Sequence, residues 1–233
     1  MNLVLVFRED FADESRVVLR GRRAGHVREV HRAALGDELV VGLAGGRIGR
    51  GRVVRIGDEI EMEITLDRDP PPPLDVTLVL ALPRPKVLNR VIAAVTSLGV
   101  KRIFLINAWR VEKSYWKSPR MAEGNLHDQS VIGLEQARDT MLPSIETRRL
   151  FRPFVEGELP AIAAGTTALV AHPYASEEYP REVRGPITLA IGPEGGFIQE
   201  EIDSLMKVGF RAVTSGPRIL RVETAISTLI GRL

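Results

Sequence analysis

Short apolar runs and polar turns alternate along the first 66 residues of the chain. EIEMEITL (59–66) alternates polar and apolar side chains, as a half-buried strand does. Three further β-prone runs, NLVLVF, DELVVGL and RIGRGRVVRI, precede it, with glycines marking the turns. One helix is expected around Ala24 to Ala34. The pattern predicts a small, mostly β, barrel-like module.

A run of four prolines ends this pattern, within the segment DRDPPPPL (67–74). Consecutive prolines donate no amide hydrogen bonds and hold the backbone extended, so neither a helix nor a central strand continues through them. We therefore expect a first domain over residues 1–69, a linker over 70–75 and a second domain over 76–233.

The second domain alternates between fully apolar strands and amphipathic helices. VTLVLAL, RIFLIN, TALVAH and ITLAIG are apolar on both faces, which is typical of covered parallel strands. KVLNRVIAAVTSLGV, IQEEIDSLMKVGF and RVETAISTLIGRL each carry an apolar stripe at helical spacing. This succession predicts an α/β domain.

Composition indicates a globular chain without unusual bias. Hydrophobic residues make up 44% and charged residues 27%, with a net charge of +2. There is no cysteine, and no apolar run approaches the roughly 18 residues of a membrane span. The opening MNLVLVF lacks the basic leader of an export signal. We expect a cytoplasmic protein with no membrane partner.

Arginine is concentrated near the N-terminus. RVVLRGRRAGHVREVHR (16–32) holds six arginines and two histidines against one acid. Arginine forms bidentate contacts with phosphate, so this segment predicts a cationic face for nucleic acid, although some of these arginines can also be an ordinary solvated face.

A glycine-rich turn, AIGPEGGF (190–197), follows one of the buried strands. In open α/β sheets, ligands bind beyond the carboxyl ends of the strands. Gly195 and Gly196 can adopt positive φ and let main-chain amides approach a ligand, while Glu194 can accept from a nearby amide. Neither of the common nucleotide motifs, GxxxxGK[ST] and GxGxxG, is present, so an apolar ring such as adenine fits better than a triphosphate. A tight turn without a ligand is the alternative.

A second stretch, SGPRILRVETA (215–225), opens the last helix with Arg221, Glu223 and Thr224. Acids and hydroxyls at a helix start satisfy free amides and the helix dipole, which accounts for Glu223 and Thr224. A cation is unfavourable there. Arg221 therefore predicts an anionic or nucleic-acid partner.

Together, IGPEGGF and ILRVETA resemble the bacterial 16S ribosomal RNA uridine N3-methyltransferases, members of the SPOUT class. The resemblance implies a PUA-like RNA-binding β-barrel followed by a SPOUT α/β domain with a deep trefoil knot. It also implies a homodimer that uses S-adenosylmethionine, without a metal, on 16S ribosomal RNA or the small ribosomal subunit. EQARDTMLP (135–143) resembles a further family segment, whereas VIAAVTSLG departs from the family's QKxxELG pattern.

The resemblance and the pattern of charges together lead us to expect roles for individual residues. Arg221 is the residue expected to stabilise the uracil or position the RNA, and Glu223 is either the base or a helix-start acceptor. The residues expected to bind the cofactor are Ala171, His172, Ile191, Gly192, Pro193, Glu194, Gly195, Gly196, Ile219, Leu220, Thr224 and Ala225. The residues expected to bind RNA are Arg20, Arg28, His31, Arg32 and Arg138.

Three other functions remain open at this point. The chain can be a SPOUT methyltransferase of another RNA such as transfer RNA, or a non-enzymatic RNA-binding assembly protein. A third alternative is a cofactor-binding α/β enzyme of small metabolites, against which the cationic first module argues.

Overall fold

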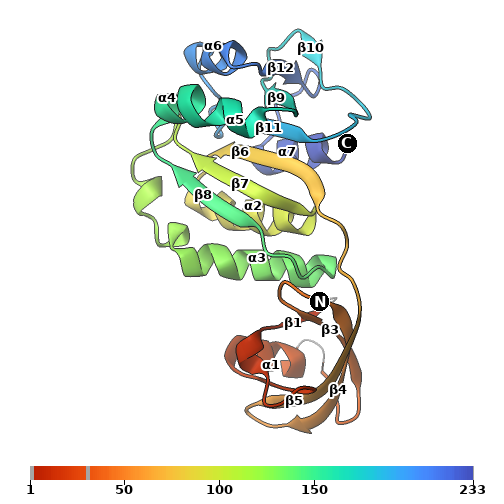
Figure 1. The fold of residues 1–233 in the computed structure, drawn as a ribbon. Coiled ribbons are helices and arrows are strands. Elements are labelled where there is room, and N and C mark those ends of the chain that lie inside the picture. Colours follow the sequence, from red (N-terminus) through yellow and green to blue (C-terminus); the bar gives the residue numbers. More distant parts are fainter. Residues whose placement is uncertain (1–2, 30–31, 233) are drawn as a thin grey trace. The chain divides into compact units, whose positions relative to one another are not determined.

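The computed structural model describes residues 3–29 and 32–232, and it divides the chain into two compact units. The first unit comprises Met1–Pro73 and Ser130–Leu142, and the second comprises Leu74–Gln129 and Pro143–Leu233. Helix α3 (Glu123–Ala137) therefore contributes residues to both units (Figure 1).

The described part of the first unit forms a curled five-stranded sheet in the order β1-β3-β4-β5-β2. Its strands are β1 (Val4–Val6), β2 (Arg16–Leu19), β3 (Glu38–Leu43), β4 (Ile48–Ile56) and β5 (Ile60–Arg68). β1 pairs with β3 in parallel, and the other pairs are antiparallel. The alternation expected for β5 is confirmed, since Ile60, Met62 and Ile64 are buried.

Two elements of this unit differ from the sequence-based expectation. Strand β2 was not expected, because its three apolar residues lie within the arginine-rich segment; all three are buried. Helix α1 (Gly21–Glu29) begins and ends earlier than predicted. Arg32 has φ +50°, a left-handed conformation that is incompatible with a continuing helix.

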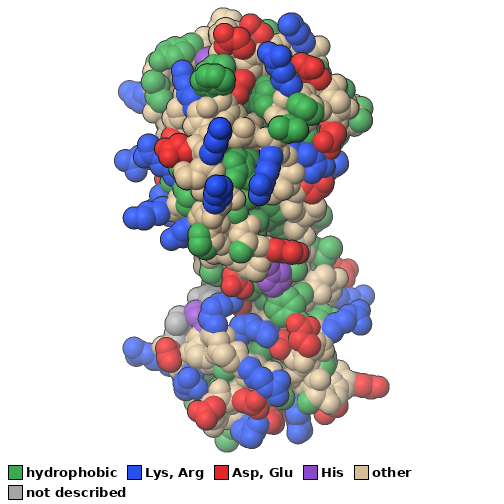
Figure 2. Space-filling view, turned by 90° about the vertical axis from the view of Figure 1, so that its left-hand side faces the viewer, with side chains coloured by type: hydrophobic (Ala, Val, Ile, Leu, Met, Phe, Trp, Pro, Cys, Tyr) green, Lys and Arg blue, Asp and Glu red, His purple; other side chains and the backbone are tan. Residues whose placement is uncertain are grey.

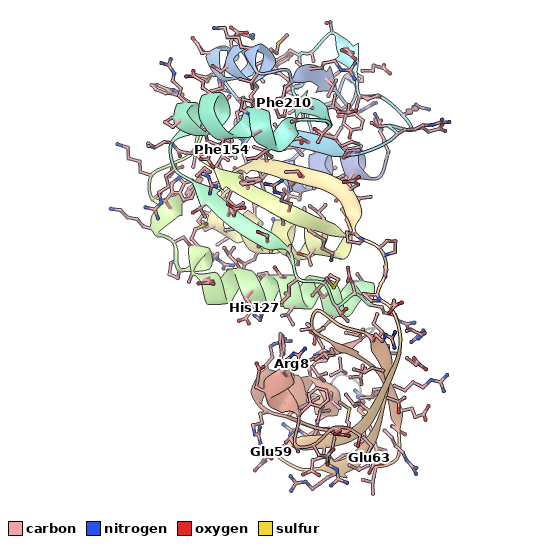
Figure 3. All side chains as sticks on the ribbon, in the orientation of Figure 1. Arg8, Glu59, Glu63, His127, Phe154 and Phe210 are labelled. Carbon is pink, nitrogen blue, oxygen red and sulfur yellow. The ribbon has the colours of Figure 1, made fainter. Side chains whose placement is uncertain are left out.

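Many arginines of the first unit pair with acids. Arg20 Nε lies 2.6 Å from an oxygen of Glu59, and Arg16 lies 3.4 Å from Glu63; both glutamates are labelled in Figure 3. Arg23 binds the buried carboxylate of Asp10. Figure 2 likewise shows Lys and Arg side chains interspersed with Asp and Glu. The positive charge of this unit is thus partly neutralised within it.

The described part of the second unit forms a seven-stranded parallel sheet in the order β10-β12-β9-β11-β6-β7-β8. Its strands are β6 (Leu74–Ala81), β7 (Val100–Ile106), β8 (Ser144–Arg148), β9 (Thr167–Ala171), β10 (Glu177–Glu178), β11 (Ile187–Ile191) and β12 (Arg211–Thr214). Its helices, besides the first part of α3, are α2 (Pro85–Ser97), α4 (Phe151–Pro153), α5 (Leu159–Ala163), α6 (Gln199–Lys207) and α7 (Val222–Ile230). The predicted α/β class is confirmed.

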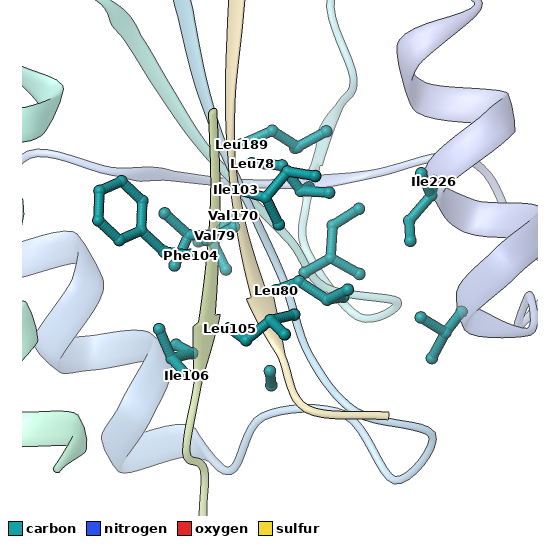
Figure 4. Close-up of a cluster of buried hydrophobic side chains, with 14 of the residues drawn as sticks. Leu78, Val79, Leu80, Ile103, Phe104, Leu105, Ile106, Val170, Leu189 and Ile226 are labelled. Atoms are coloured by element: carbon teal, nitrogen blue, oxygen red, sulfur yellow. The ribbon is translucent and has the colours of Figure 1, made fainter. Parts of the chain in front are cut away.

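Both faces of this sheet are covered, as the apolar strands predicted. Along β7, Phe104 and Ile106 point to one side, whereas Leu105 points to the side of Ile226 in α7 (Figure 4). Phe154 and Phe210, labelled in Figure 3, belong to the same core. Helix α3 and strand β8 were not predicted, because their sequences carry no clear apolar stripe or run. No helix within the described residues is long and apolar enough to cross a membrane.

Glu135, in the α3 portion of the first unit, is a buried acid with few partners. Its side chain is only 2% exposed. One carboxylate oxygen accepts from the amide of Leu5 at 3.4 Å, and the other lies 3.5 Å from Nη1 of Arg22. Burial raises the pKa of Glu135 and outweighs the opposing effect of Arg22.

This raised pKa predicts a pH-dependent stability. The native state holds the Glu135 proton more tightly than the unfolded chain, so the group favours folding at low pH. Its contribution is lost as pH rises from the ordinary pKa of 4.5 through the higher pKa of the native state. As pH rises through this range, the wild type loses this stabilisation and Glu135→Gln does not. We therefore expect the unfolding free energy of Glu135→Gln to increase relative to that of the wild type. Urea denaturation at a series of pH values measures it, with the exposed Glu63→Gln as control. Parallel pH profiles would show that Glu135 titrates normally.

Candidate functional site

In the glycine-rich turn after β11, neighbouring main-chain and side-chain atoms lie so close to two of the glycines that a Cβ there would collide with them. A Cβ at Gly192 would lie 2.8 Å from the amide nitrogen of Phe197, and one at Gly195 would lie 2.8 Å from Cδ of Arg110. Gly196 has φ +72°, whereas Gly195 has no positive φ. The first two glycines are thus required by close approach and the third by backbone conformation.

Two neighbouring segments hold this turn. Glu194 accepts a 2.9 Å hydrogen bond from the amide of Arg84, just before α2, which confirms the expected main-chain contact. Arg110, after β7, donates to the carbonyl of Gly195. Within the turn, the Gly196 amide donates to the carbonyl of Pro193 at 2.7 Å. The turn is therefore fixed from both sides.

A cavity of about 390 Å³ opens beside this turn. It lies at the carboxyl ends of β9, β11 and β12, the edge of a parallel sheet where ligands bind, and α7 lines it. Every residue that the sequence assigned to cofactor binding lines this cavity except Thr224, which is exposed. Those lining residues are Ala171, His172, Ile191, Gly192, Pro193, Glu194, Gly195, Gly196, Ile219, Leu220 and Ala225.

The cavity has further lining residues that were not among those assigned to the cofactor. They are Arg110, Pro173, Tyr174, Val213, Ser215, Arg218, Val222 and Leu229. Tyr174 is 80% exposed, and its ring meets that of His172 edge-on with centroids 5.8 Å apart. Burial lowers the pKa of His172, which favours the neutral imidazole. Arg218 lies within the second motif, so the sequence could have predicted it as a lining residue. Arg110 lies far from both motifs in the sequence, and no pattern around it indicates that it lines this cavity.

Arg221 and Glu223 lie at the start of α7 but do not line the cavity. Arg221 is exposed, and among the described residues its guanidinium has no hydrogen bond or ion pair. Glu223 lies 3.3 Å from Nη2 of Arg90 in α2 instead of accepting from the amides of the helix start. The start of α7 therefore places beside the cavity one cation without a partner among the described residues, Arg221, and one carboxylate paired with Arg90, Glu223.

The residues expected to bind RNA lie in the first unit. Arg28 donates to the carbonyl of Gly57 at 2.9 Å, and Arg20 pairs with Glu59 as described above. Arg32 and Arg138 are exposed and have positive φ of +50° and +55°. His31 lies outside the described residues.

Comparison with known proteins yields consistent relatives. A model of an RNA methyltransferase domain matches residues 70–233. Ribosomal RNA small subunit methyltransferase E of Treponema pallidum is 29% identical over 97% of this chain and 87% of its own length. The protein of the same name from Mycobacterium bovis is 29% identical over 92% of this chain and 84% of its own length.

Two solved structures are similar in fold. The Neisseria gonorrhoeae ribosomal RNA small subunit methyltransferase E, bound to S-adenosylmethionine, superposes with a TM-score of 0.75 at 21% identity, over 98% of this chain and 95% of its own. A Legionella pneumophila protein in complex with the same cofactor superposes with a TM-score of 0.77 at 22% identity, over 99% of this chain and 96% of its own.

The close contacts of the turn predict unequal effects of alanine substitution. Gly196→Ala should cost about 1 kcal/mol of unfolding free energy, because only its backbone conformation is strained. Gly192→Ala should cost more, because main chain must shift to admit the new Cβ. Thermal unfolding measures both, with Gly209→Ala, also at positive φ with open space around it, as the control for Gly196. Equal losses at 192 and 196 would contradict the packing argument.

Proposed function

Because this chain belongs to the RNA methyltransferase family, we propose that it transfers a methyl group from S-adenosylmethionine to N3 of a uridine in 16S ribosomal RNA. The observation that carries the proposal is the convergence of both sequence motifs on one cavity. The relatives named for small-subunit ribosomal RNA support the substrate.

The cavity fits this cofactor in kind and in size. Apolar side chains, including Ile191, Leu220 and Leu229, suit the faces of an adenine ring. Gly192 and Gly195 line the cavity without a side chain of their own, so main-chain groups can approach the ring edge and ribose; the exception is the Gly195 carbonyl, which accepts from Arg110. The volume of about 390 Å³ is within the usual range for small-molecule sites.

Methyl transfer is an in-line displacement for which the bound cofactor supplies both the methyl group and a good leaving group. The chain contributes alignment, which is a large part of catalysis in such reactions. Uridine N3 is protonated at neutral pH, so the reacting base needs proton removal or stabilisation of its anion. We assign stabilisation to Arg221, whose guanidinium is unpaired among the described residues. Glu223, tethered by Arg90, is the candidate that accepts the N3 proton.

Several finer features follow as part of the proposal. Residues 1–69 would form a PUA-like RNA-binding barrel, which the curled five-stranded sheet supports. Residues 76–233 would form the SPOUT domain, and residues 70–75 would link the two. A trefoil knot is supported by the strand order, since β12 lies beyond β9 while the following α7 packs against α2. Exposed Trp109 and Leu150, at 79% and 68%, suit a homodimer interface. With ribosomal RNA as substrate, the activity belongs in the cytoplasm.

The test of this function uses ribosomal RNA from a strain that lacks the gene. N3 methylation removes a Watson–Crick donor, so reverse transcriptase should stall at the modified uridine in wild-type RNA and read through in the deletion strain. Purified protein with S-adenosylmethionine should restore the stall. Unchanged stalls together with tight cofactor binding would favour another RNA, such as transfer RNA. No cofactor binding would favour an assembly protein.

Arg221 separates chemistry from cofactor binding. Arg221→Ala should lower kcat by about 100-fold, a loss typical of one charge-stabilising group, and leave cofactor affinity unchanged. Single-turnover methylation and calorimetry measure the two quantities. The exposed Arg184→Ala, outside the cavity, is the matched control. Full turnover with normal RNA affinity in Arg221→Ala would refute the assignment.

The first unit should bind RNA through phosphate contacts. Each contact releases counterions, so Arg28→Gln and Arg32→Gln should each reduce the slope of log affinity against log salt by about 1. Filter binding at several salt concentrations measures the slope. Arg47→Gln is the control, because Arg47 was not expected to bind RNA. It resembles Arg28 in having an acidic partner, Asp69 at 3.2 Å for Arg47 and Glu29 at 3.7 Å for Arg28. A slope unchanged by both substitutions would show that these arginines are solvated surface.

A further inference from the structure

The charges that line the cavity are uneven. Arg110 and Arg218 contribute two cations, and Glu194 contributes one carboxylate. One oxygen of Glu194 already accepts from the Arg84 amide. No acid of the described residues pairs with Arg110 or Arg218. The positive charges of Arg110 and Arg218 are therefore not neutralised by acids of the described residues.

Arg110 is held in position by its neighbours in the chain. The Trp109 amide donates at 2.7 Å to the carboxylate of Glu201, which is only 6% exposed, and Val111 is buried at 7%. The stem of Arg110 packs against Gly195, and its guanidinium donates to the Gly195 carbonyl. A group fixed in this way loses little conformational entropy when it binds a ligand.

Most of the donor capacity of Arg110 is left for a ligand. A guanidinium carries five N–H donors, and the Gly195 carbonyl takes one of them. Planar guanidinium groups prefer carboxylates and phosphates, which they bind in a bidentate manner. Arg218 has no such anchor: among the described residues its guanidinium has no hydrogen-bond partner.

We propose that Arg110 forms an anion subsite at the cavity wall, which binds the carboxylate of the cofactor's amino-acid portion and so selects a cofactor that carries it. This inference rests on the proposed function. The carboxylate is the one anionic group of the cofactor, so it is the group that a guanidinium binds most strongly. The close packing at Gly195 then has a purpose, because a side chain at that position would displace Arg110.

The test compares two ligands without a sulfonium charge. S-adenosylhomocysteine carries the amino acid, and methylthioadenosine shares the adenosine and thioether but lacks it. Calorimetry with Arg110→Gln should show S-adenosylhomocysteine bound about tenfold more weakly and methylthioadenosine bound as in the wild type. Arg110→Lys should restore part of the affinity. Added salt should weaken S-adenosylhomocysteine binding in the wild type and have less effect in Arg110→Gln.

The controls separate this subsite from simple support of the glycine turn. Equal losses for the two ligands, or no loss for either, would overturn the inference and leave the proposed function intact. Arg184→Gln, at an exposed position outside the cavity, should change neither affinity. A carboxylate-selective loss in Arg218→Gln with none in Arg110→Gln would also overturn the inference. Wild-type protein that binds neither ligand would instead refute the proposed cofactor itself.

Discussion

The close approach of the main chain at the end of β11 is the constraint on which the rest of the site depends. At Gly192 and Gly195 the space that a Cβ would need is taken by Phe197 and Arg110. The turn can therefore lie against its neighbours, and Glu194 and Arg110 fix it to two other segments. A parallel sheet brings these segments to one edge, because the carboxyl ends of all its strands lie there. The cavity is the result of this arrangement.

Charge is distributed around the cavity in a way that separates binding from chemistry. Arg110 lines the cavity and is anchored by the main chain, while Arg221 stands outside it and is free among the described residues. Glu223 is tied to Arg90 on the neighbouring helix. In the proposed reaction the anchored cation serves the cofactor, and the free cation serves the RNA. Such a division lets cofactor binding and turnover be altered independently.

The first unit illustrates how tertiary structure changes the meaning of a charged segment. Six arginines between residues 16 and 32 indicated a cationic face. In the structure, Arg16, Arg20 and Arg23 pair with acids from β5, the residue before it and the N-terminal segment. The acids are distant in sequence, so local composition overstated the free charge. The residues left for phosphate contacts are fewer, which makes their individual contributions measurable.

The sequence by itself determined the α/β class, most strands of both units and the two turns that meet at the cavity. Periodicity and glycine placement are local properties, and they act before any long-range contact forms. Tertiary structure alone decided that Arg110, 85 residues before Gly195, completes the wall. It also decided that Glu223 binds Arg90 and that the weakly patterned α3 is a helix. These outcomes depend on which segments the folded sheet brings together, and no spacing within one segment encodes them.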